Sequence, residues 1–335
     1  MEETAKMKKV LAITLVCLLT LTALTACGSG DTQSSGQGTE SSPANSPASS
    51  PADSPSNSTA ISPSSPPAAE SPQGTTNDSN FDLNHFINVV RREAASGTHG
   101  AFIELFGILH DGVDRTTPEA QTADGTNLVL TTVAGDTYAI GYVSMGALNP
   151  TVKALSVDGV APSVDNINNG TYGVMRPFNI AYKDLSNVAQ DFYDFIFSAE
   201  GQAVVLDRGY ITVDDTGPFS STQPSGTVTV SGSTSVEPLM ARLIQAYEEI
   251  NPNARIDLQG GGSSAGMRDA IGDISDIGMA SRDLSADEIS QLNHRAICID
   301  GIAIIANLDN PLTNIISDDV TDIYIGEITA WSEIQ

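Results

Sequence analysis

The chain has 335 residues with 41 acidic and 15 basic side chains, which gives a net charge of −26 at pH 7. A surface this negative argues against nucleic acid or an anionic membrane as a binding partner, because either would be repelled. A small anion is repelled as well, so a site for one would depend on short hydrogen bonds inside a pocket from which water is excluded.

The N-terminal residues have the pattern of a bacterial secretion signal. Two lysines precede an apolar stretch at 10–24, which is short for a membrane-spanning helix, and small residues precede Cys27. These features predict a lipoprotein signal peptide over residues 1–26 and a palmitate-type lipid anchor on Cys27. The alternatives are a transmembrane anchor or a chance cysteine.

Residues 27–82 consist mainly of Ser, Pro, Ala, Thr and Asn. A segment with so few large apolar side chains cannot offset the entropy lost on folding, so we expect a disordered tether. With the lipid on Cys27, it would hold the folded part near the outer face of the cell membrane, in an envelope of the Gram-positive type.

The remaining residues form two blocks in which strand and helix patterns alternate, separated by a Pro-, Gly- and Ser-rich linker at 214–226. In the first block we expect strands at 86–90, 138–142 and 152–157 and helices at 102–106, 186–198 and 200–207. In the second we expect strands at 227–230, 255–258, 277–280 and 297–306 and helices at 236–247, 264–271 and 286–292. Such alternation predicts an α/β fold with mostly parallel sheets.

Three loops rich in Ser, Thr and Gly each lie between a strand and a helix, at 96–98, 232–235 and 260–264. Backbone N–H groups and hydroxyls at a helix start favour an anion, and ligands of open α/β sheets lie beyond the carboxyl ends of the strands. Arg92, four residues before the first loop, adds a guanidinium suited to phosphate. Each loop alone is weak evidence for an anion site, because such loops also occur as ordinary helix caps. Residues 234–237, for example, also match the pattern of a capping box.

These motifs resemble the phosphate-binding protein of bacterial ABC phosphate transporters. Residues 227–335 resemble the N-terminal half of that family and residues 84–213 its C-terminal half. The matching stretches are 92–98, 139–142, 198–202, 232–239, 261–266, 276–282, 300–303, 310–311 and 323–331. The resemblance implies a two-lobed periplasmic-binding-protein-like fold of type II. Lobe two would comprise 83–176 plus 307–335, and lobe one 177–306.

The resemblance also implies the phosphate-binding residues. Thr234, Ser235 and Ser263 would donate hydrogen bonds from one lobe, and the other lobe would contribute Arg92, Ser96, Gly97 and Thr98. Ser281 stands where the family commonly has an Asp that accepts the proton of hydrogen phosphate. Serine accepts that proton weakly and lacks the charge that rejects sulfate, so the choice between the two oxyanions stays open.

The two halves occur in reversed order, which predicts a circular permutation of the family fold with the cut in a loop of lobe two. The alternatives are a fragment of a tandem duplication and a dimer that exchanges halves. If the chain ends meet within one molecule, a monomer is expected.

The function that we predict is extracellular binding of inorganic phosphate and its delivery to the permease of an ABC importer. The alternatives are a binder of another tetrahedral oxyanion such as sulfate, and a surface sensor or interaction protein without a role in transport. We expect no enzyme activity, cofactor or metal site, because none of the four histidines has metal-ligand spacing and no nucleophile elbow is visible. His99 is expected to be solvated, and Cys298 to be a buried apolar side chain.

Overall fold

The computed structural model describes residues 81–335. The predicted signal peptide, the lipid site at Cys27 and the tether up to residue 80 lie outside these described residues. Among residues 81–335, no helix combines the length and the apolar character that crossing a membrane requires.

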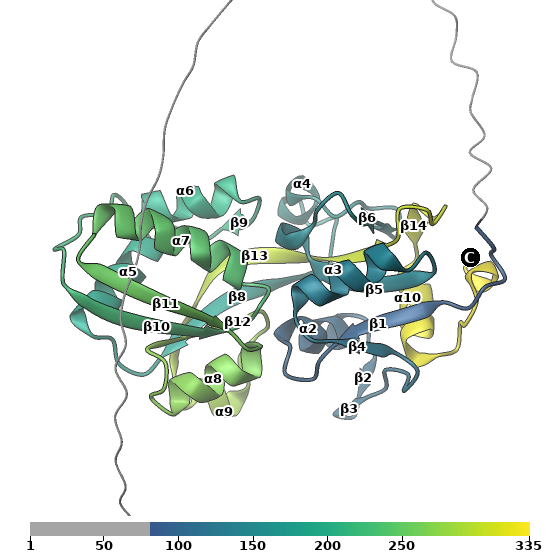
Figure 1. Cartoon of the computed structure of the whole chain (residues 1–335), viewed down its shortest axis with the longest axis horizontal. Helices are drawn as coiled ribbons and strands as arrows, with labels where there is room; N and C mark the ends of the chain where they lie inside the picture. The colour runs from purple at the N-terminus through teal and green to yellow at the C-terminus, as the bar shows by residue number, and fades with distance from the viewer. Residues whose placement is uncertain (1–80) are drawn as a thin grey trace, which may run out of the picture. The chain divides into compact units, whose positions relative to one another are not determined.

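A mixed sheet of ten strands organises the fold, with the main order β11-β10-β12-β8-β13-β5-β1-β4, while β6 and β9 pair with β13 (Figure 1). Its strands are β1 (Asn88–Arg92), β4 (Gln121–Ala123), β5 (Ala139–Ser144), β6 (Lys153–Ala154), β8 (Met175–Tyr182), β9 (Ile211–Thr212), β10 (Gly226–Gly232), β11 (Ala254–Gly260), β12 (Ile277–Ala280) and β13 (Asn293–Ala306). Two small sheets pair β7 (Ser156–Val157) with β14 (Asn314–Ile315), and β2 (Leu109–His110) with β3 (Val113–Asp114).

The sheet is parallel only in its outer parts, so the expectation of mostly parallel sheets is wrong for its centre. Strand β10 is parallel to β11 and β12, and β1 is parallel to β4 and β5. Between these groups, β8 and β13 run antiparallel to each other and to their outer neighbours. Two long adjacent strands therefore connect two parallel α/β units.

Nine α-helices accompany the strands of the described part, with short 3₁₀ turns η1 (Met145–Ala147) and η2 (Trp331–Glu333). The α-helices are α2 (Gly97–Leu105), α3 (Thr126–Gly135), α4 (Val164–Asn168), α5 (Asn187–Ile196), α6 (Ala199–Asp207), α7 (Glu237–Ile250), α8 (Ser263–Ile271), α9 (Ala286–Ile289) and α10 (Ser317–Ile325). The predicted apolar face of α7 is confirmed, since Leu239, Leu243 and Tyr247 are among its buried residues.

Most predicted elements are present with shifted ends. The strand predicted at 277–280 has the observed bounds of β12, whereas the helix at 286–292 is only the short α9 and the strand at 152–157 is divided into β6 and β7. Strand β13 runs unbroken through Asp300 and Gly301 and begins four residues before the strand predicted at 297–306. The sequence did not predict α3, α10 or β8.

The apolar interior of the described residues is divided into four clusters: one around β10, β12 and α7, two around β1, β5 and β13, and a small one that includes Met267 and Ala270 of α8. Phe192 and Met240 belong to the first cluster, and Phe102 and Tyr324 to the second. Strand β13 contributes to both sides, because its early residue Ile297 packs in the first cluster and its last five residues pack in the second and third.

The linker at 214–226 has no regular structure before β10 begins, yet it is held against the first cluster. Phe219 packs on Phe195 and Tyr247, with ring centroids 5.3 and 6.3 Å apart. Asp191 accepts hydrogen bonds from the Ser221 hydroxyl at 2.6 Å and the Thr222 N–H at 3.2 Å. The link between the two blocks is therefore part of the folded body.

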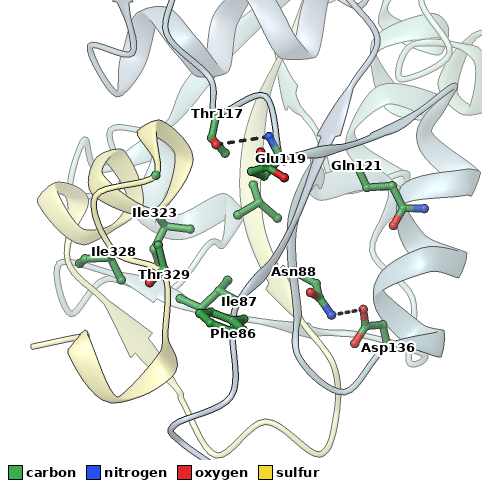
Figure 2. A pocket seen from close by; sticks show the side chains of 12 residues that line it. Phe86, Ile87, Asn88, Thr117, Glu119, Gln121, Asp136, Ile323, Ile328 and Thr329 are labelled. Carbon is green, nitrogen blue, oxygen red and sulfur yellow. Dashed lines mark hydrogen bonds between the residues drawn. The ribbon is translucent and has the colours of Figure 1, made fainter.

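The two ends of the described chain are joined by backbone hydrogen bonds. Ile87 N–H donates to Thr329 O at 2.8 Å, and Ser332 N–H donates to Leu83 O at 2.7 Å. Figure 2 shows a cavity beside this junction, of about 690 Å³, lined by residues of both end segments, including Ile87 and Thr329. It lies at the start of β1, and none of the predicted site residues lines it.

Candidate functional site

Several hydroxyl-bearing segments begin where parallel strands end. Strand β1 leads into α2, β4 into α3 and β11 into α8, and the first residues of these helices are Gly97, Thr126 and Ser263. The loop 233–236 follows β10 and precedes α7. Because the first N–H groups of a helix have no partner within it, these starts concentrate hydrogen-bond donors and the positive ends of helix dipoles.

Arg92 is the last residue of β1 and its side chain is buried, with only 2% exposed. Its guanidinium donates to Thr234 Oγ1 at 2.9 Å and to Thr126 Oγ1 at 3.2 Å. It also donates two hydrogen bonds, of 2.7 and 2.8 Å, to the Glu93 carboxylate. Burial raises the pKa of Glu93, but the hydrogen bond and charge of Arg92 outweigh it and lower the pKa below its usual value. An ionised Glu93 thus fixes the guanidinium against the hydroxyl groups.

Thr98 connects hydroxyls from distant parts of the chain. Its Oγ1 lies 2.8 Å from Ser235 Oγ and 3.3 Å from Ser281 Oγ. Ser281 Oγ accepts from the Ser233 hydroxyl at 2.9 Å, and Ser281 N–H donates to Ser263 Oγ at 3.1 Å. All five side chains are buried, so these groups form one water-excluded cluster of exchangeable hydrogen-bond donors and acceptors.

Gly97, the first residue of α2, lies against Ser263, the first residue of α8. A Cβ atom at this position would be 2.9 Å from Ser281 Oγ and closer still to Ser263 Oγ. The backbone makes the same contact nearby, because Ser264 N–H donates to Ala95 O at 3.1 Å. Only glycine allows the start of α2 to meet the hydroxyls of the other block at this distance.

His99 is buried rather than solvated, so that expectation is wrong. Its Nδ1 lies 2.8 Å from Tyr142 Oη and its Nε2 lies 2.8 Å from Asp114 Oδ2. Tyr142 Oη also accepts from the Arg92 backbone N–H at 3.1 Å. Burial lowers the pKa of His99, against the opposing influence of Asp114. The ring therefore supports the backbone of Arg92 through the Tyr142 hydroxyl.

The structure brings seven of the eight residues predicted to bind phosphate into this cluster. They are Arg92, Gly97, Thr98, Thr234, Ser235, Ser263 and Ser281. The eighth, Ser96, is buried beside it, and its hydroxyl accepts the His99 N–H at 3.3 Å as the N-cap of α2. Whether these residues bind an anion stays a prediction at this point.

The capping box predicted at residues 234–237 is wrong, because α7 begins only at Glu237 and its N-cap, Val236, makes no side-chain bond. The hydroxyls of Thr234 and Ser235 are thereby left to contact the first block. A capping box is present instead at Ser285, before α9.

Sequence reasoning missed three polar residues of the cluster: Thr126, Ser233 and Arg176, whose Nη2 donates to Thr98 Oγ1 at 3.0 Å. Thr126 follows Gly125, whose φ of 86° is the kind of backbone that glycine permits at a helix start. That Gly-Thr pair was a usable signal, whereas Arg176 had none because β8 was not predicted. Among residues 81–335, no cluster of three His, Cys, Asp or Glu side chains could hold a metal ion.

Comparison with known proteins gives a consistent result. The model of the PBP superfamily domain matches residues 217–335. A "Phosphate-binding protein PstS 2" from Streptococcus agalactiae is 41% identical over 269 residues, which cover 78% of this chain and 92% of the relative. The chain belongs to the PstS family of phosphate-binding proteins. The resemblance found in the sequence is thereby confirmed.

A solved PstS-family structure shows the same fold. The phosphate-binding protein of a phosphate ABC transporter from Streptococcus pneumoniae is 42% identical, with a TM-score of 0.61 over 75% of this chain and 100% of that one. The PstS protein of Bacillus subtilis is matched differently, at 33% identity over 132 residues that cover 38% of this chain and 42% of that protein. The PstS relatives thus fall into two groups. Some match this chain over nearly their whole length, and others match it over less than half of their length.

Proposed function

We propose that this PstS-family chain binds inorganic phosphate outside the cell and delivers it to the permease of an ABC importer. The observation that carries the proposal is the meeting of the two blocks at the hydroxyl cluster. Arg92 contacts Thr234, 142 positions away, and Thr98 contacts Ser235, 137 positions away. The names of the relatives agree with this ligand.

Each group has a role that suits a tetrahedral oxyanion. Arg92, held by Glu93, supplies a buried positive charge, and the hydroxyls of Thr98, Thr234, Ser235 and Ser263 donate hydrogen bonds in its surroundings. The starts of α2, α3 and α8 add backbone donors and dipoles. Because the cluster excludes water, these interactions act at short range against the long-range repulsion of a chain with a net charge of −26.

The division into lobes belongs to this proposal. The sequence predicts 83–176 plus 307–335 as lobe two and 177–306 as lobe one, and the ion would be held where the lobes meet. Residues 302–306 pack with the interior of lobe two, which favours a boundary within β13 near residue 301. Strands β8 and β13 are the connections that would bend as the lobes close.

The proposed setting is the outer face of the membrane, with a lipid on Cys27 and the tether of 27–82 keeping the binder near its permease. A binding role without catalysis fits this setting, since the cluster offers donors but no nucleophile paired with a base. A carrier of this kind selects its closed form through contacts that only the ion can complete from both lobes.

We further propose that the chain is a circular permutant, with its two halves in the reverse of the order that the resemblance implies for the family. The bonded ends at 83–87 and 329–332 supply the junction that such a permutation requires. Coverage supports it: a relative in the original order can align with only one half at a time, and the Bacillus subtilis protein matches over 42% of its length. The match over 92% of the Streptococcus agalactiae relative implies that it shares the order seen here.

Titration calorimetry with inorganic phosphate tests the binding proposal. Replacing Arg92→Ala should weaken phosphate binding by about a hundredfold or more, because Glu93 is left unpaired and the ion loses its charged partner. The exposed ion pair Arg255–Asp257 supplies the control, and Arg255→Ala should leave the affinity unchanged. An unchanged affinity in Arg92→Ala would exclude this site.

Ser281 favours a second candidate, a site for sulfate or another fully ionised oxyanion. Its uncharged hydroxyl already accepts from Ser233, so it is a poor acceptor for the proton of hydrogen phosphate and repels sulfate little. Competition of sulfate against phosphate in the same calorimeter separates the two ligands, and tighter binding of sulfate would replace the phosphate assignment.

A further inference from the structure

A buried ion pair adjoins the hydroxyl cluster. Arg176 lies in β8 directly opposite Asp300 in β13, and their side chains are 2% and 0% exposed. Arg176 Nη2 lies 3.2 Å from Asp300 Oδ2, while the other carboxylate oxygen accepts from the Ser144 hydroxyl at 3.0 Å. The pair thus lies on the two strands that connect the α/β units.

The protein leaves this pair incompletely satisfied. Arg176 Nε and Nη1 are buried and have no hydrogen-bond partner among the described residues, and Asp300 Oδ2 contacts Arg176 without hydrogen-bond geometry. Burial lowers the pKa of Arg176 to about 10 and raises that of Asp300 to about 6, although each charge opposes the effect on the other. A buried ion pair of this kind contributes little to the free energy of folding. We therefore look for its role in the hydroxyl cluster that it adjoins.

Arg176 determines how one hydroxyl of the cluster is oriented. Its Nη2 donates to Thr98 Oγ1 at 3.0 Å, and a guanidinium has no acceptor atom. Thr98 Oγ1 must therefore accept from Arg176, and its single hydrogen is directed to another group. The neighbours within reach are Ser235 Oγ at 2.8 Å and Ser281 Oγ at 3.3 Å, which surround the position proposed for the ion.

We propose that Arg176, held by Asp300, is a positioning residue of the anion site that makes Thr98 an obligatory hydrogen-bond donor to the oxyanion. This inference rests on the proposed function and extends it to residues in the connecting strands. A donor held in this way suits a fully ionised oxygen, because accepting from Arg176 leaves the Thr98 hydroxyl hydrogen for the ligand. The pair also links the geometry of β8 and β13 to one contact of the ion.

A double-mutant cycle measured by phosphate titration tests the inference. Removing both charges together, by Arg176→Met with Asp300→Leu, avoids leaving one charge buried alone. This change should weaken phosphate binding at least tenfold in the parent protein and less than threefold in Thr98→Val, because the effect passes through the Thr98 hydroxyl. Equal losses in both backgrounds, or no loss, would overturn the inference.

Arg176→Lys provides a second variant should the apolar pair fail to fold. Lysine keeps the charge and a donor, so it should retain more affinity than Arg176→Met with Asp300→Leu, and its loss should also disappear in Thr98→Val. The exposed pair Lys183–Asp273, at the end of β8, is the matched control, and its removal by Lys183→Met with Asp273→Leu should leave binding unchanged. If the parent protein binds no phosphate, the proposed function fails; if it binds and the losses are additive, only this inference fails.

Discussion

The two partners of His99 fix its protonation at the scale of a single residue. Tyr142 Oη accepts the Arg92 N–H, so its own hydrogen is free to be donated to His99 Nδ1. We therefore assign the hydrogen of the neutral ring to Nε2, which donates to Asp114. A second proton on Nδ1 would face the Tyr142 hydroxyl hydrogen and remove its acceptor. This contact agrees with burial in lowering the pKa of His99.

Stability should therefore depend on pH through His99. Because its folded pKa is below the unfolded value near 6.5, the unfolded chain binds more protons as the pH falls. The stabilising effect of the neutral, buried His99 is fully present above about pH 6.5 and is lost as the pH falls below that value, at up to about 1.4 kcal/mol per pH unit. Urea unfolding of His99→Gln should show a flatter pH dependence over this window than the parent protein. His110 is exposed, so His110→Gln should keep the pH dependence of the parent protein. Equal slopes for the two variants would contradict the role of His99.

At the scale of elements, the sequence predicted what depends on local pattern. The loops at 96–98, 232–235 and 260–264 were found from glycine and hydroxyl residues between strand and helix patterns, and they meet because parallel strands end at one edge. Helix α3 was missed although it contributes Thr126. Strand β8 was missed because its pairing with β12 and β13 is long-range and antiparallel, and with it Arg176 was missed. Side-chain partners across 142 positions, such as Arg92 and Thr234, came from the family resemblance rather than from pattern.

The start of α2 supplies a prediction at this scale. Gly97→Ala would place a methyl group against Ser263 and Ser281, so the two blocks could not meet around the ion as closely. We expect phosphate binding to weaken by about tenfold or more while the protein remains folded. Gly100→Ala is the matched control within the same helix, because its methyl group would make only an ordinary 3.6 Å contact with Arg282 Cδ. Circular dichroism and phosphate titration of both variants decide the point, and similar affinities would show that the close approach is not required.

At the scale of the whole described body, the fold does not depend on the order in which its segments follow one another along the chain. If the order of the blocks is reversed as proposed, the parallel strands β1 and β10 still direct their following loops into one cluster. Packing depends on which segments meet, and a junction closed by hydrogen bonds between 83–87 and 329–332 replaces a covalent connection there. Under the proposed permutation, the linker at 214–226 joins the two segments that would be the chain ends in the original order, and Phe219 packs it against the first cluster.

If this is correct, the order of the halves can be reversed without loss of function. A chain that begins at Asp215, runs to Gln335, continues through a linker of about six Gly and Ser residues to Leu83 and ends at Asp214 would have its new ends at exposed positions. Its phosphate affinity should stay within about threefold of the parent, and light scattering should give a monomer for both. The same linker inserted between Asp214 and Asp215 of the natural order is the control for disturbing that loop. A rearranged chain that lost binding or dimerised, beside a control that did neither, would show that the ends at 83 and 335 cannot be joined within one molecule and that the halves are exchanged between two.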